Sequence, residues 1–226
     1  MQVNSDFSKI ATVAPEDHDW TPSTQSHVER IMLDRIGEEK ARATSLVRYA
    51  PNSSFPNHIH TGGEEIFVLS GTFSDESGDY SKGWYLRNPV RSSHAPFSKE
   101  GTKIFVKLWQ MQPDDQQTVR INTNDVNQWT FENGRQSCNL FKNEHETTSL
   151  QRLQSHEALF TNSHFDAPLE LMVIAGSVVF ANKEYLEESW IRLPKGKHEK
   201  LFVGEQGATI YQKIGQFQNT DYEGSK

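Results

Sequence analysis

The chain has 226 residues, a formal net charge of −7, and 35% hydrophobic and 11% aromatic residues. This composition is typical of a globular protein, and the length allows one large β domain or two domains of about a hundred residues each. The negative charge and the lack of a Lys/Arg cluster argue against a general nucleic-acid binder and against binding to an acidic membrane surface.

The cysteine and hydropathy patterns indicate a cellular compartment. Cys138 is the only cysteine, so no disulfide can form within the chain. No apolar N-terminal stretch resembles a signal peptide, and no apolar run approaches the length of a membrane span. We therefore expect a cytoplasmic protein in a reducing compartment.

Short strands and turns are expected along most of the chain. Residues 26–35 fit a helix or a strand, because their apolar positions do not form a clean helical stripe. Further strands are expected at residues 43–49, 83–87 and 104–108, with turns or polar loops at 51–54 and 75–79 and a frayed tail at 218–226.

The second half of the chain repeats the first. Residues 44–49 match residues 148–153, residues 65–71 match 170–176, and residues 101–108 match 207–214. These matches follow the same order in both halves. They predict two copies of one β unit, at 1–112 and 113–226, and an all-β fold of barrels or sandwiches.

The chemistry is concentrated in residues 58–71. His58 and His60 alternate along an expected strand and therefore point to the same side. A Gly62-Gly63 turn follows them, and then a carboxylate, Glu64, opens an apolar run. Two imidazoles and a carboxylate on one side make most of a metal site, and His94 is the natural fourth ligand. The alternative is that these histidines are ordinary core or surface residues, but burying three such groups without a partner would be costly.

The spacing of these residues resembles a known family. The pattern His58-x-His60-x-x-x-Glu64, six residues and Gly71 resembles the first motif of the cupins, and Gly83, Pro89 and His94 resemble the second. More detailed similarity to the ChrR-type cupins lies in residues 47–51, 62–69, 75–80, 87–89 and 101–107.

The resemblance implies a jelly-roll barrel for each half of the chain, as in a bacterial bicupin. It also implies that His58, His60, Glu64 and His94 bind one divalent ion in the N-terminal barrel. Zinc is the metal that the ChrR-type family suggests, although the same ligands suit Fe, Mn, Ni or Co. Glu65 is the alternative ligand, because the repeat pairs it with Glu170, whereas the spacing to Gly71 favours Glu64.

The second half departs from the cupin pattern. Asn162 replaces the first histidine and Leu169 stands where Glu64 is expected, whereas His164, Glu170 and His198 remain. A weaker second metal site could therefore form in this half. The alternative is a structural copy that has lost its site.

Three functions are compatible with the sequence. The first is a zinc-binding sensor or regulatory module of transcription related to ChrR anti-sigma factors. Direct binding of a sigma factor is in doubt, since the chain has no helical His-x-x-x-Cys-x-x-Cys zinc domain.

The second function is a metal-dependent enzyme of the cupin class, such as a dioxygenase that cleaves a small diketone, with Glu65, Tyr80 or Tyr85 as proton carriers. The third is a binding or storage protein without metal chemistry. A small-molecule ligand in the barrel and a homodimer are further expectations.

Overall fold

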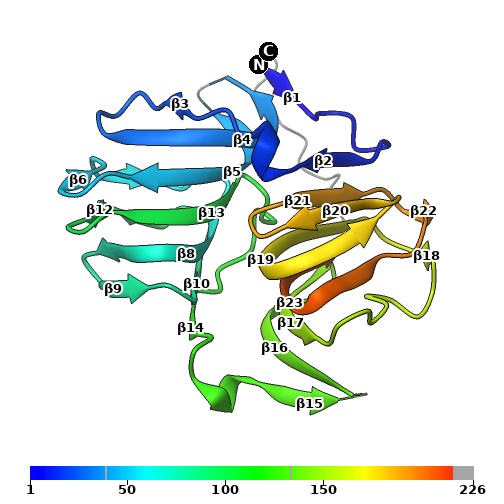
Figure 1. Ribbon diagram of the computed structural model, residues 1–226. Helices are drawn as coiled ribbons and strands as arrows, with labels where there is room; N and C mark the ends of the chain where they lie inside the picture. Colours follow the sequence, from blue (N-terminus) through cyan, green and yellow to red (C-terminus); the bar gives the residue numbers. More distant parts are fainter. Residues whose placement is uncertain (39, 133, 216–226) are drawn as a thin grey trace. The chain divides into compact units, whose positions relative to one another are not determined.

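The computed structural model describes residues 1–38, 40–132 and 134–215, and the expected fraying of residues 218–226 lies outside them. Strands make up most of the ordered structure (Figure 1), and two short 3₁₀ helices, η1 (Pro15–Asp17) and η2 (Val126–Gln128), interrupt them. No helical segment of the described chain has the length and apolarity that crossing a bilayer requires.

The described residues form two compact units. Unit 1 contains residues 1–5 and 19–124, and unit 2 contains residues 6–18 and 125–215. We predicted a boundary between residues 112 and 113 from the repeat. The compact units instead follow the strand pairing, so that residues 6–18 belong with the second half and residues 113–124 with the first.

Unit 1 is built on one long sheet with the strand order β1-β4-β5-β13-β8-β10-β14. Its strands are β1 (Gln2–Val3), β4 (Val28–Gly37), β5 (Ala41–Tyr49), β13 (Thr102–Leu108), β8 (Glu64–Asp75), β10 (Trp84–Asn88) and β14 (Val119–Asn122). Shorter pieces pair around it: β3 (Thr21–Pro22), β6 (Ser53–Ser54), β7 (His58–Ile59), β9 (Gly78–Ser81), β11 (Ser93–His94) and β12 (Phe97–Ser98).

Unit 2 repeats this plan with the strand order β15-β16-β17-β23-β19-β21-β2. Its strands are β15 (Thr130–Glu132), β16 (Arg135–Lys142), β17 (Glu146–Leu153), β23 (Phe202–Gly215), β19 (Leu169–Phe180), β21 (Trp190–Leu193) and β2 (Ala11–Val13). The additional strands are β18 (His164–Phe165), β20 (Lys183–Leu186) and β22 (Gly196–Lys197). The prediction of an all-β fold with two tandem barrels is thus confirmed.

The segment for which the sequence was compatible with either a helix or a strand lies mostly in β4. Residues 28–37 pair with β5 along their whole length, with a bulge between Met32 and Asp34. The bulge explains the irregular spacing of the apolar residues, because one extra residue shifts the alternation of faces.

A pair of glycines recurs in both units. Gly71 has a φ of +68°, and a Cβ placed on it would lie 2.0 Å from the carbonyl oxygen of Gly101. Gly176 has a φ of +75° and makes the same approach to Gly207. Only glycine allows both this conformation and this distance, so the repeat of the glycines reflects the same close approach in the two equivalent strands, β8 and β19.

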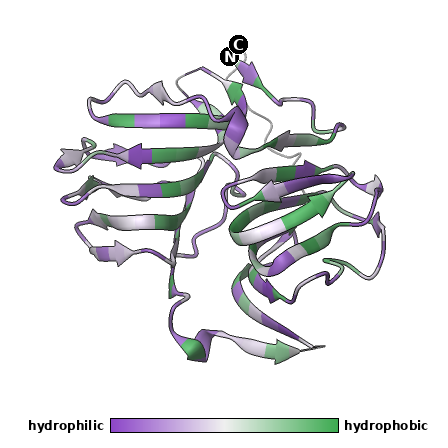
Figure 2. Ribbon diagram, in the orientation of Figure 1, coloured by the Kyte–Doolittle hydropathy of each residue, from purple (hydrophilic) through white to green (hydrophobic). Residues whose placement is uncertain are grey.

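The interiors of the two units differ in composition. Unit 1 buries a cluster that includes Val28, Tyr49, Ile66 and Val106, and its strands mix hydrophobic and hydrophilic residues (Figure 2). Unit 2 buries a larger apolar cluster along β19 and its neighbours. The polar side chains inside unit 1 are therefore the place to look for a functional site.

Candidate metal centre

Four side chains of unit 1 converge on one point. Their candidate ligand atoms all lie within 4.8 Å of one another, in the group formed by His58, His60, Glu64 and His94. No other group of three or more His, Cys, Asp or Glu residues with this geometry occurs in the part of the chain that the structure describes.

Strand pairing and a tight turn bring the four residues together. In the pair β7–β11, His58 lies directly opposite His94. His60 lies just beyond β7, and the amide of Gly63 donates to its carbonyl at 3.3 Å to close a turn. Gly63 has a φ of +75°, which suits glycine. The chain then enters β8 at Glu64.

The three imidazoles pack closely around the carboxylate. Their ring centroids are 4.6–5.0 Å apart, and Glu64 Oε2 lies 3.5 Å from His60 Nε2 and 3.4 Å from His94 Nε2. Both of these Nε2 atoms are buried and have no hydrogen-bond partner. Buried nitrogen lone pairs without partners are costly, and a shared cation would satisfy them, so the residues present fit a metal ion.

The outer nitrogens of two imidazoles are held by hydrogen bonds. His58 Nδ1 lies 3.0 Å from the carbonyl oxygen of Pro56, and His94 Nδ1 lies 3.2 Å from Asp75 Oδ2. An acceptor at Nδ1 places the proton there and leaves the Nε2 lone pair directed into the cluster. Partners of this kind orient histidines for metal binding.

The carboxylate of Glu64 is also held in place. Asn88 Nδ2 donates to Glu64 Oε2 at 2.8 Å, and Arg120 Nη2 donates to Asn88 Oδ1 at 2.6 Å. Arg120 Nε in turn donates to the Tyr80 hydroxyl at 3.3 Å. This chain of donors fixes the rotamer of Glu64 against the imidazoles.

The pKa values of two histidines move in opposite directions. Burial lowers the pKa of His60, and the negative charge of Glu64 only partly opposes this effect. Burial also acts to lower the pKa of His94, but the hydrogen bond to Asp75 and the charge of Glu64 outweigh it, so the pKa of His94 is raised. Metal binding requires both rings to be neutral.

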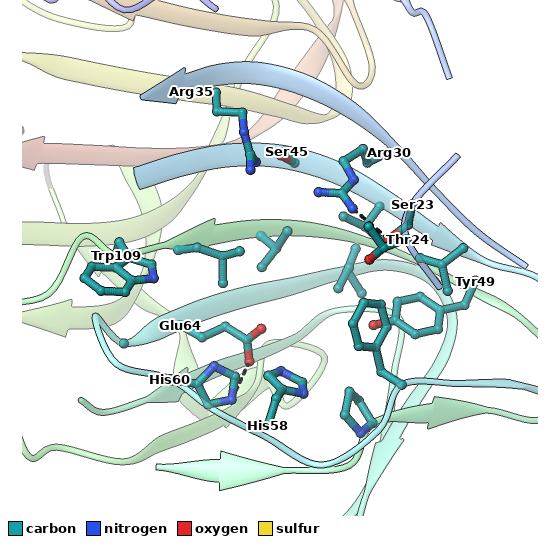
Figure 3. A pocket seen from close by; sticks show the side chains of 18 of the residues that line it. Ser23, Thr24, Arg30, Arg35, Ser45, Tyr49, His58, His60, Glu64 and Trp109 are labelled. Atoms are coloured by element: carbon teal, nitrogen blue, oxygen red, sulfur yellow. Dashed lines mark hydrogen bonds and ion pairs between the residues drawn. The ribbon is translucent and has the colours of Figure 1, made fainter. Parts of the chain in front are cut away.

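Three of the four candidate ligands line a cavity of about 320 Å³. His58, His60 and Glu64 lie along one side of it, and Arg30 and Ser23 lie along the opposite side (Figure 3). Apolar side chains from the central strands line the space between them: Val28, Val47, Ile104, Val106 and Leu108. The volume is at the lower end of the range typical of small-molecule sites.

A comparison with known families gives a match in the first half of the chain. Residues 8–112 match the family model described as the ChrR cupin-like domain. This part, just under half of the chain, is therefore similar to the ChrR-type cupins. No curated protein matches the sequence.

Solved structures show the same fold for the bicupin chain at low sequence identity. A candidate dioxygenase from Nostoc punctiforme PCC 73102 aligns with a TM-score of 0.74 at 13% identity, over 95% of this chain and 85% of the other. The nickel(II) complex of the pirin YhhW from Escherichia coli has a TM-score of 0.67 at 10% identity, over 92% and 100% of the two chains. A single-residue variant of oxalate decarboxylase from Bacillus subtilis has a TM-score of 0.61 at 11% identity, over 92% and 77%.

The structure separates the two adjacent glutamates of the cupin motif. Glu64 faces the histidines, whereas Glu65 points to the opposite face of the sheet and pairs with Arg87 Nη1 at 3.2 Å. Arg87 also pairs with Asp115 at 2.5 Å. Glu65, the alternative ligand, is thus part of a buried ion pair and is absent from the four-residue group.

The candidate proton carriers lie outside the cavity. Tyr80 accepts a hydrogen bond from Arg120, and Tyr85 lies opposite Phe67 on the same face as Arg87. The tyrosine that lines the cavity is Tyr49. Tyr49 is the last residue of β5. The sequence does not point to it, because no local pattern shows that the inner face of β5 borders the histidines.

The structure does not bring the residues of the weaker second site together. His164 is exposed and lies opposite Lys197 in the pair β18–β22. Glu170 is fully buried and accepts a hydrogen bond from the indole of Trp190 at 2.7 Å. His198 Nε2 lies 2.7 Å from the carbonyl oxygen of Pro194. These partners leave no shared point for an ion.

The register explains why the second cupin copy differs. Glu64 lies opposite Asn88 between β8 and β10, whereas Leu169 lies opposite Leu193 between β19 and β21. Both leucines are fully buried in the apolar cluster of unit 2. Hydrocarbon therefore occupies the position that holds the carboxylate and its amide donor in unit 1.

Proposed function

We propose that the N-terminal cupin barrel binds one divalent ion through His58, His60, Glu64 and His94 and acts as a metal-dependent enzyme on a small molecule. The observation that supports this proposal is the cavity of about 320 Å³ that three of the four candidate ligands line. Structural metal sites are closed by protein ligands, whereas catalytic sites keep positions open for water or substrate.

A divalent ion at this point would supply Lewis-acid polarisation of a ligand oxygen and, if it were iron, chemistry with dioxygen. The protein itself supplies the orientation. Asp75 and Pro56 fix two imidazoles, and Asn88 fixes Glu64. The apolar wall restricts water around the ligand, which strengthens electrostatic interactions inside the cavity.

Tyr49 is the group best placed to exchange a proton or a hydrogen bond with a ligand. It is buried, and burial together with the negative charge of Glu64 raises the pKa of its hydroxyl. The hydroxyl is therefore neutral at physiological pH and acts as a donor. Removing it by Tyr49→Phe tests this role with little change in the volume of the side chain.

The donor set of three imidazoles and one carboxylate suits several metals, including Zn, Fe, Mn, Ni and Co. Two of the similar structures are described with nickel(II), in YhhW, and with manganese(II), in oxalate decarboxylase. We propose a redox-active or Lewis-acidic first-row metal for the enzyme, and elemental analysis of protein purified without chelator identifies it.

The experiment follows oxygen consumption by protein reconstituted with Fe(II), Mn(II), Ni(II) or Zn(II) in the presence of small diketones and keto acids. His60→Gln is the inactive control, and His164→Gln is the matched control in the second barrel. Turnover in wild type and His164→Gln, and its loss in His60→Gln, supports the proposal. Full metal loading without turnover of any compound would count against it.

A regulatory metal sensor is the second candidate, because residues 8–112 match the ChrR cupin-like domain. In this alternative the barrel binds a metal, zinc above all, and a small ligand, and a surface of the protein transmits the bound state. Co-purification with extracytoplasmic-function sigma factors tests it directly. Recovery of a sigma factor by wild type but not by metal-free protein would favour the sensor over the enzyme.

A further inference from the structure

Two arginines, Arg30 and Arg35, line the cavity away from the histidine cluster. Arg35 donates to the carbonyl oxygen of Glu38. Arg30 lies on β4, lines the cavity, and is partly buried. Its Nη2 donates to Ser23 Oγ at 2.7 Å. Within residues 1–38, 40–132 and 134–215, Arg30 forms no ion pair with a carboxylate.

A partly buried guanidinium without a carboxylate is an unusual arrangement. Burial lowers the pKa of Arg30, yet an arginine remains charged in proteins. Its five N–H donors form a planar fork that matches a carboxylate or phosphate, and the bond to Ser23 uses only one of them. The remaining donors are available to an anion that enters the cavity.

Arg30 and Glu64 face the same interior. Val28 and Arg30 share one face of β4, and Arg30 lies opposite Val47 of β5. Val47 lies opposite Ile104 of β13, and the same face of β13 leads to Leu108, opposite Glu64. The two charged residues are thus on one continuous inner face, at its two ends.

The strand order sets the distance that a ligand must span. β4 and β8 are separated by β5 and β13. Three strand spacings amount to about 14 Å across the sheet, and the offset from Ile104, which is level with Arg30, to Leu108, opposite Glu64, adds about 13 Å along it. The curvature of the sheet and the length of the inward side chains shorten the direct path. Oxalate and malonate are too short for this span, whereas a carboxylate with several intervening carbon atoms fits it.

Tyr49 is affected by the charged groups at both ends of this inner face. The pKa of its hydroxyl is raised by burial and by Glu64, and this rise is opposed by Arg30. Both charges therefore act on the same hydroxyl. A ligand that reaches from the histidine cluster to Arg30 would pass this neutral donor.

We propose that Arg30, with the hydroxyl of Ser23, forms an anion subsite. The ligand class is an elongated organic acid that places its carboxylate on Arg30, its hydrocarbon part against the apolar wall, and a metal-binding oxygen at the histidine cluster. This proposal rests on the proposed metal site and names the substrate class for it. Thr24, beside Ser23 at the cavity, contributes a further hydroxyl near its rim.

The test measures binding of straight-chain dicarboxylates from malonate to suberate, together with the monomethyl ester of each, by calorimetry. The protein is the full chain, and its metal content is determined on the same samples. We expect a diacid longer than malonate to bind best, and to bind about tenfold more tightly than its monomethyl ester, since a charge-assisted hydrogen bond is lost in the ester.

Arg30→Met keeps the length of the side chain and removes its charge, and Arg30→Lys keeps the charge without the planar fork. Arg48→Met is the matched control, because Arg48 lies on the neighbouring strand, pairs with Glu29 at 2.6 Å and does not line this cavity. We expect Arg30→Met to abolish the preference for diacid over ester, Arg30→Lys to retain part of it, and Arg48→Met to behave as wild type.

The outcomes separate the two proposals. Metal-loaded wild type that binds diacid and ester equally overturns the anion subsite and leaves the metal centre intact. Wild type that holds no metal overturns the proposed function, and binding of the diacids to that metal-free protein, lost in Arg30→Met, would still support the subsite. An equal loss in Arg30→Met and Arg48→Met would indicate a general effect of charge and overturn the subsite.

Discussion

Asp75 accepts a hydrogen bond from His94 Nδ1 at 3.2 Å, and this contact directs His94 Nε2 toward Glu64 Oε2, 3.4 Å away. The amide of Ser77 donates to the other oxygen of Asp75 at 2.8 Å, so the aspartate is itself fixed. Carboxylates that orient a metal-binding histidine typically contribute about ten- to a hundredfold to metal affinity.

Asp75→Asn should therefore lower metal affinity by about tenfold to a hundredfold without removing the site. Chelator competition measures the affinity. The control is Asp79→Asn, because Asp79 bonds to Ser74 at 2.6 Å and contacts no histidine. Equal affinities for the two variants would show that Asp75 does not orient His94.

The adjacent glutamates should have opposite effects when each is neutralised. Glu64→Gln should weaken metal binding and change the stability of the metal-free protein little. Glu65→Gln should leave metal binding in place and lower the free energy of unfolding by about 2 kcal/mol, because Arg87 loses one of its two carboxylate partners and keeps Asp115. Urea denaturation and metal titration of both variants check this, and loss of metal by Glu65→Gln alone would reverse the assignment.

The whole chain should bind one ion. The histidines of unit 2 are engaged elsewhere or exposed, so wild type, His164→Gln and His198→Gln should each hold one equivalent of metal by elemental analysis. His60→Gln and His94→Gln should hold none at stoichiometric metal. A second equivalent in wild type that disappears in His198→Gln would contradict the structure of unit 2.

The two histidines with shifted pKa values should give opposite pH trends in metal-free protein. The raised pKa of His94 means that its protonated form is stabilised by folding, a contribution present below its ordinary pKa of 6.5 and lost as the pH rises through the raised value. The stability advantage of wild type over His94→Gln should thus shrink as the pH rises from below 6.5 to above the raised pKa.

His60 provides the internal comparison, since burial lowers its pKa. Its neutral form is the one that folding favours, so the contribution is present above its ordinary pKa and is lost as the pH falls through the lowered value. Wild type should therefore gain stability relative to His60→Gln as the pH rises. Urea denaturation measures both trends. Parallel trends for the two variants would contradict the groups that the structure places around one of the two histidines.

Cys138 should be unreactive in the native protein. Its side chain is fully buried, and burial raises the pKa of the thiol to about 11. Because the thiolate is the reactive form, a disulfide reagent should modify the protein only as it unfolds in urea. Rapid modification without denaturant would contradict this burial.

The sequence by itself determined the duplication and the all-β fold, and it predicted a candidate metal centre of His58, His60, His94 and either Glu64 or Glu65. Most of the centre depends on local spacing: two histidines at alternate positions, a glycine turn and a carboxylate at its end lie within seven residues, whereas His94 comes from a separate motif. The glycine pairs at Gly71 and Gly176 are local in the same sense, because each position requires a conformation that only glycine adopts freely.

Only the tertiary structure decided what surrounds those four residues. Strand parity says that Glu64 and Glu65 point to opposite faces, but the register with β10 decides which face carries Asn88 and which carries Arg87. Likewise, no local pattern shows that Arg30 faces the same cavity as the histidines. The physical reason is that neighbours across a sheet come from distant parts of the chain, and a shift of one residue in their pairing would exchange every inward side chain for an outward one.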